Sequence, residues 1–218
     1  LFCRLFHYGF YLALPSVVLL ICMLVSYLPE WLDKKLSGSS IFRIVMTVII
    51  IIFTLGYIRT SNKIYADKTF PVGSGGDRIM TFRPEIDPRG LQTARTVEWI
   101  RSNLDEKETF VVLPAGVMIN YLTRRADPTP YMGFMLPVML MFGEDVVLDT
   151  FTKHSPDYFV IVHRDTSEFG VGYFGQDPGY GEKIMNWINE YYFPVCLFGE
   201  EPLRGRQFGI KILKRRKD

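Results

Sequence analysis

Two long stretches without charged side chains lead the chain, and a sequence that mixes polar and apolar residues follows them. Residues 9–29 and residues 44–58 contain no charge. A helix needs about 20 apolar residues to cross the hydrocarbon core of a bilayer. The first stretch has that length, and the second reaches it when residues 41–43 are included, with the guanidinium of Arg43 at the headgroups. The pattern predicts two transmembrane helices within residues 1–60.

The basic residues between the two stretches predict their orientation. Lys34 and Lys35 lie in the connecting loop, and Arg43 follows it. Short loops rich in Lys and Arg stay in the cytoplasm, so we expect this loop to be cytoplasmic and the C-terminal domain to be extracytoplasmic. The first stretch is longer than the apolar region of a signal peptide, and no small-residue cleavage site follows it. Because Leu1 rather than Met begins the chain, we expect it to be part of a longer protein.

The remaining sequence alternates between segments with helical spacing of apolar residues and short apolar runs. Apolar residues recur at helical spacing in four segments, which are residues 91–104, 117–125, 143–153 and 181–192. Short apolar runs typical of strands form four others, which are residues 109–113, 157–163, 193–198 and 208–213. Strands that alternate with helices predict an α/β three-layer sandwich with a mixed sheet. We expect the first two strands to be parallel and the last two to form an antiparallel hairpin at the edge.

Turn-forming residues mark the boundary of this domain. Residues 61–90 include the runs PVGSGGD and RPEIDPRG, which are typical of loops. The expected organisation is therefore a membrane anchor over residues 1–60, a linker or cap over residues 61–90, and an extracytoplasmic α/β domain over residues 91–218.

Composition restricts the possible partners. The 25 Lys and Arg residues against 23 Asp and Glu residues give a net charge of +2, which is too small to indicate nucleic-acid binding. Cys3 and Cys22 belong to the anchor, and only Cys196 lies in the domain, so no disulfide framework is expected. No pattern indicates a cofactor.

Four residues deserve a test as metal ligands or catalytic groups. His154, Asp157, His163 and Asp165 lie close together in the sequence, but their spacing matches no zinc motif. His163 and Asp165 follow a predicted strand, where polar residues are ordinary. The chain also lacks a Gly-x-Ser-x-Gly elbow. We therefore assign no metal site and no catalytic residue.

An uncharged, methionine-rich segment at residues 129–143 is too short to cross a bilayer. It is either a core helix or a segment on the membrane face, where flexible Met side chains suit apolar contacts. Just before it lie Asn120, Tyr121, Arg124 and Arg125. Adjacent arginines can bind a phosphate headgroup through charge-assisted hydrogen bonds, so these four residues are the candidate substrate-binding site. The alternative is a helix C-terminus, whose carbonyls and dipole favour cations.

Several sequence segments of the domain resemble those of a known family. They are FVVLPAGVMINYLTRRADPTPY at 110–131, PDYFVIVHRDTSEFG at 156–170, YFGQDPGYGEKIMNWINEYYFPVCLFGEEPL at 173–203 and FGIKILKR at 208–215. Together with the two apolar stretches, they resemble the C-terminal part of a bacterial type C membrane glycosyltransferase of the dolichyl-phosphate-mannose protein mannosyltransferase-like group. The resemblance covers most of residues 90–216.

The resemblance implies a function and a location. Such enzymes of the bacterial inner membrane transfer a sugar, with inversion, from a polyprenyl-phosphate donor to a glycan, lipid or protein acceptor. Their catalytic acidic residue lies in the first extracytoplasmic loop, which has no counterpart here, so this part would cap the active-site cavity. Two alternatives remain: a non-catalytic membrane-anchored domain that binds envelope glycan or a partner protein, and a regulatory subunit of an envelope assembly complex.

Overall fold

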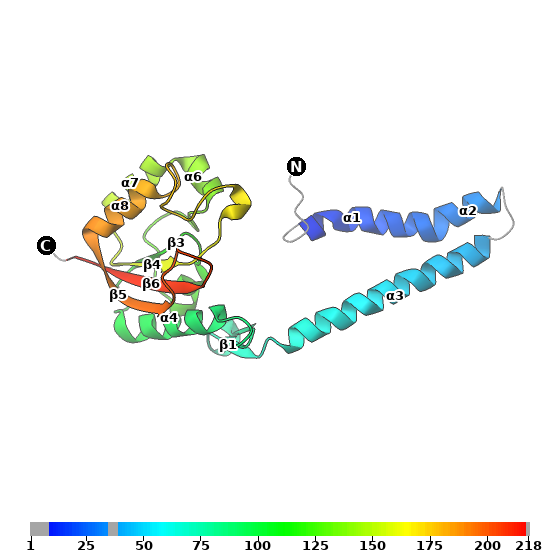
Figure 1. Cartoon of the computed structure of the whole chain (residues 1–218), viewed down its shortest axis with the longest axis horizontal. Coiled ribbons are helices and arrows are strands. Elements are labelled where there is room, and N and C mark those ends of the chain that lie inside the picture. The colour runs from blue at the N-terminus through cyan, green and yellow to red at the C-terminus, as the bar shows by residue number, and fades with distance from the viewer. Residues whose placement is uncertain (1–8, 35–38, 217–218) are drawn as a thin grey trace. The chain divides into compact units, whose positions relative to one another are not determined.

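The computed structural model describes residues 9–34 and 39–216 of the chain (Figure 1). Lys35, which entered the orientation argument, and Cys3 lie outside the described residues. The chain divides into two compact units, Leu1–Ala66 and Asp67–Asp218.

The first unit consists of helices. Their bounds are α1 Gly9–Cys22, the π-helical turn η1 Met23–Tyr27, α2 Leu28–Asp33 and α3 Ser39–Ala66. Two helical stretches, Ala13–Asp33 and Ser40–Ala66, are long and apolar enough to cross a membrane. The expected pair of apolar helices near the N-terminus is therefore confirmed.

Helix α3 is longer than the apolar stretch that predicted it. It continues through residues 59–66, which read RTSNKIYA. No Gly or Pro interrupts this polar segment, so nothing in the sequence ends the helix there. Three residues then connect α3 to the first strand of the second unit.

A mixed four-stranded sheet forms the centre of the second unit. Its strands are β3 Phe110–Leu113, β4 Tyr158–Val162, β5 Tyr192–Gly199 and β6 Gly209–Arg215, in the order β3-β4-β6-β5. Strands β3 and β4 are parallel, and β6 is antiparallel to both β4 and β5. Both the expected parallel pair and the expected hairpin are confirmed. Strand β5 lies at the edge, where a bulge between Pro194 and Cys196 interrupts its pairing with β6.

Five helices accompany the sheet. They are α4 Arg89–Asn103, α5 Met118–Thr123, α6 Leu136–Phe142, α7 Glu144–Lys153 and α8 Glu182–Tyr191. A short 3-10 turn, η3 Ser167–Phe169, follows β4. Figure 1 shows α4 on one side of the sheet and α6, α7 and α8 on the other.

The core consists of two clusters because side chains alternate along each strand. Phe110 and Val112 of β3 pack with α4 and α5. Val111 and Leu113 pack with α6, α7 and α8. All four side chains of β3 are buried, although this strand pairs only with β4.

A small hairpin occupies part of the segment expected to be a linker or cap. It consists of β1 Phe70–Val72, the 3-10 turn η2 Gly75–Asp77 and β2 Ile79–Thr81. The hairpin packs closely against the start of α4. A Cβ atom at Gly90 would come within 2.1 Å of the Thr81 hydroxyl oxygen. Only glycine permits this approach.

Candidate functional site

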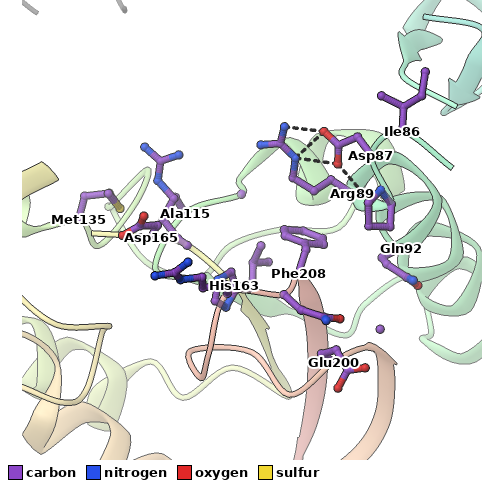
Figure 2. A pocket seen from close by; sticks show the side chains of 17 residues that line it. Ile86, Asp87, Arg89, Gln92, Ala115, Met135, His163, Asp165, Glu200 and Phe208 are labelled. Atoms are coloured by element: carbon purple, nitrogen blue, oxygen red, sulfur yellow. Dashed lines mark hydrogen bonds and ion pairs between the residues drawn. The ribbon is translucent and has the colours of Figure 1, made fainter. Parts of the chain in front are cut away.

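A cleft of about 960 Å³ lies at the carboxyl ends of β3 and β4 (Figure 2). Ala115 and Gly116 follow β3, and Val162 and His163 stand at the end of β4. The start of α4 and the ends of the β5–β6 connection complete the walls. Ligands of open α/β sheets bind at the carboxyl ends of parallel strands, which makes this cleft the candidate site.

An ion pair lies at the α4 side of the cleft. The Arg89 side chain donates to both carboxylate oxygens of Asp87, at 2.9 and 2.8 Å from Nε, and the Arg89 backbone N–H donates to the same carboxylate. These hydrogen bonds lower the pKa of Asp87 and raise the pKa of Arg89. Both groups are therefore charged and satisfy each other (Figure 2).

The segment after β4 supplies a second set of charges. Arg164 donates to Glu168 at 3.0 Å. Asp165 accepts a hydrogen bond from the Ser167 N–H at 2.9 Å, which lowers the pKa of the Asp165 carboxyl. Among the lining residues, three arginines face three carboxylates; these are Arg89, Arg164 and Arg206, and Asp87, Asp165 and Glu200. The cleft is thus polar and nearly neutral.

A hydrogen bond from the backbone fixes the tautomer of His163, which lines the cleft. Its Nδ1 accepts the backbone N–H of Leu203 at 3.2 Å, so the proton of the neutral ring is on Nε2. Burial lowers the pKa of His163 against an opposing effect of Asp165. The rings of Tyr173 and Phe208 lie 5.2 and 6.5 Å from it and fix its plane.

Gln92 provides an unsatisfied polar group at the wall. Gln92 is only 9% exposed, and its Oε1 has no hydrogen-bond partner among the described residues. Figure 2 shows its side chain on the α4 side of the cleft. An unpaired buried oxygen costs about 1–3 kcal/mol, and the Oε1 of Gln92 is itself shielded from solvent.

The four residues predicted from the sequence lie at the opposite end of β3. The amide of Asn120 donates to the carbonyl of Phe110, the first residue of β3, at 2.9 Å. The Phe110 N–H in turn donates to the carbonyl of Ala126. Asn120, Tyr121, Arg124 and Arg125 are therefore near the amino end of β3 and do not line the cleft.

The two arginines of this set have different surroundings. Arg124 takes a left-handed conformation at the end of α5, forms an ion pair with Asp77 and lies 4.3 Å over the Tyr121 ring. The Tyr121 hydroxyl donates to the same Asp77 carboxylate at 2.6 Å. Arg125 instead donates to the carbonyl of Leu104 at 2.9 Å. Each side chain thus has a protein partner, and the two guanidinium groups reach different elements.

The methionine-rich segment is buried in part and exposed in part. Phe134 and Met139 are buried in the core. Met132 and Met141, in contrast, are 81% and 74% exposed. An apolar hollow of about 450 Å³ lies among residues of this segment, including Tyr131, Met132, Val138 and Phe142.

Sequence reasoning treated the polar residues after β4 as ordinary and missed the cleft. The available signal was the parallel pair itself, because it places residues 114–116 and 163–165 at one edge. Within the described parts of the chain, no three His, Cys, Asp or Glu residues are placed to hold a metal ion. Comparison with known proteins finds no matching protein family and no matching curated protein.

Proposed function

We propose that the chain is the C-terminal part of an integral-membrane glycosyltransferase that uses a polyprenyl-phosphate-linked sugar donor. In this proposal the helices Ala13–Asp33 and Ser40–Ala66 cross a bacterial inner membrane. The second unit, as a three-layer α/β sandwich on the extracytoplasmic side, caps the active-site cavity. Lys34, which follows α2, and Arg43, which lies near the start of α3, support this orientation.

The observation that carries the proposal is the polar cleft on a unit attached closely to an apolar helix. Only three residues separate α3 from β1, so in this proposal a short connection tethers the second unit to a membrane-spanning helix. Side chains on α3 such as Phe53 are 76% exposed, as expected for a helix that has lipid around it. The cleft offers paired charges, an imidazole N–H and an amide, which suit hydroxyl groups of a glycan.

The residues of this chain suit a binding role rather than a catalytic one. No catalytic residue is assigned to this chain, and the catalytic acidic residue of the resembled family belongs to a region without a counterpart here. We therefore place the chemistry outside these residues and give the cleft a binding role. The partners are membrane lipid, the lipid-linked donor, and a glycan, lipid or protein acceptor.

A transfer assay tests the proposal. Membranes that contain the protein with its natural upstream coding region should transfer radiolabelled hexose from polyprenyl-phosphate to endogenous acceptor, whereas membranes without it should not. Arg206→Ala, which alters the cleft, should reduce transfer at low donor concentration. Arg204→Ala removes an exposed arginine that does not line the cleft and should leave transfer unchanged. Equal label transfer with and without the protein would refute the proposal.

One observation favours the second candidate, a non-catalytic domain that binds envelope glycan or a partner protein. The cleft arginines Arg89 and Arg164 are both paired with carboxylates, which leaves fewer cations for the phosphate of a lipid-linked donor and suits binding of a neutral glycan. Retention of purified envelope glycan by the detergent-extracted chain, together with no transfer by the membranes above, would support this candidate.

A further inference from the structure

The polar cleft and the apolar hollow adjoin each other. Met135 lines both of them. Figure 2 shows Met135 on the side of the cleft where Ala115 and Asp165 lie. A ligand in the cleft therefore has an apolar surface next to it, within the same unit.

Apolar side chains dominate the lining of the hollow. Aromatic contacts fix its lining, because the ring of Tyr131 lies 5.2 Å from that of Phe142 and 5.8 Å from that of Phe134. Met132 and Val138 add flexible and branched apolar groups. Burial of exposed apolar surface is the main favourable contribution that such a site can make, and Met side chains adapt to chains of different shape.

Most charges of the cleft are balanced. Arg89 and Arg164 already have carboxylate partners, and the carboxylates of Asp165 and Glu200 line the same walls. Arg206, which forms no ion pair among the described residues, and Gln207 also line the cleft. A ligand can therefore meet a guanidinium and an amide there besides the imidazole of His163. Donors and acceptors of both kinds, at a neutral site, match the hydroxyl groups of a sugar.

We propose that the cleft and the hollow together bind one amphiphilic molecule, with a glycosyl head in the cleft and a hydrocarbon chain in the hollow. This proposal deepens the proposed function, since a lipid-linked sugar is the substrate class named there. It assigns contact with the lipid chain to the segment that contains α6. The residues Asn120, Tyr121, Arg124 and Arg125 take no part in it.

Short alkyl glycosides provide the test. The full chain in amphipol is titrated calorimetrically with methyl and hexyl glycosides of glucose, galactose and mannose. For at least one sugar, the hexyl glycoside should bind about tenfold or more tightly than the methyl glycoside, since two buried methylene groups already account for that factor.

Matched variants locate the two halves of the ligand. Met132→Ser should remove most of the gain from the hexyl chain, whereas Met141→Ser should retain it, because Met141 is similarly exposed but does not line the hollow. Arg206→Ala should weaken binding of both glycosides, and Arg204→Ala should not.

Three results would overturn the proposal. They are no binding of any glycoside, equal affinity for methyl and hexyl glycosides, and equal effects of Met132→Ser and Met141→Ser. The last result would indicate that the apolar surface meets a bilayer rather than a single chain. If glycosides bind as expected while the membranes show no sugar transfer, the proposed function fails and this inference stands.

Discussion

Replacement of Arg125 by Ala should destabilise the second unit, whereas replacement of its neighbour Arg124 should not. The Arg125 guanidinium donates to the carbonyl of Leu104 at 2.9 Å and to the carbonyl of Thr123 at 3.2 Å. It thereby joins the ends of α4 and α5. The Arg124 side chain is exposed and pairs with Asp77 across water-accessible surface, where such pairs contribute little.

The magnitude follows from the two hydrogen bonds of Arg125. A hydrogen bond to a charged group contributes roughly 1.5–3 kcal/mol. Because the two bonds share one half-buried side chain and are not additive, we expect Arg125→Ala to lower the free energy of unfolding by about 2–4 kcal/mol.

Urea unfolding of the full chain in detergent measures this difference through near-ultraviolet circular dichroism, which reports the packed aromatic core. Arg124→Ala serves as the matched control, with a midpoint close to that of the wild type. Unchanged unfolding of Arg125→Ala would refute the structural role. If each single substitution instead raised the concentration of lipid-linked donor needed for transfer by the same factor, at unchanged stability, the result would support the headgroup site predicted from the sequence.

Three further outcomes are expected. Tyr192→Phe should lower the free energy of unfolding by about 1–3 kcal/mol, measured in urea, because the buried hydroxyl donates to the carbonyl of Pro156 at 2.8 Å and that carbonyl would lose its partner. Stability should fall as the pH drops below about 6.5, because burial lowers the pKa of folded His163 and the unfolded chain binds the proton first. His163→Asn should make the melting temperature depend less on pH over this range, and an unchanged pH dependence would contradict the prediction. In a cysteine-free background of intact cells, an impermeant thiol reagent should label Ser167→Cys and not Ser40→Cys, and the reverse pattern would invert the orientation.

Long apolar segments and buried strands could be predicted because local sequence determines them. Within residues 157–163, the run from Tyr158 to Val162 contains no charged residue, and the structure buries all of β4. The hairpin of β5 and β6 follows from two apolar runs around the turn-forming segment EEPLRGR. The strands β1 and β2 have three residues each, which is too short for a periodicity to show.

The candidate site was harder to predict because tertiary structure assembles it. Asp87, His163 and Glu200 come from three distant parts of the sequence, and the sheet brings them to one edge. Arg124 and Arg125 are adjacent in sequence, but α5 ends at Thr123 and Arg124 takes a left-handed conformation. Adjacency therefore suggested a shared ligand, whereas the backbone directs the two side chains to different elements.

The bulge in β5 has a consequence for solubility. An edge strand with apolar side chains such as Leu197, which is exposed, invites a second chain to add to the sheet. Pro194 has no N–H to offer such a chain, and the irregular register beside it interrupts any regular ladder. Pro194 and the irregular register thus both oppose edge-to-edge association of the unit, and a residue with an N–H at position 194 would weaken that protection.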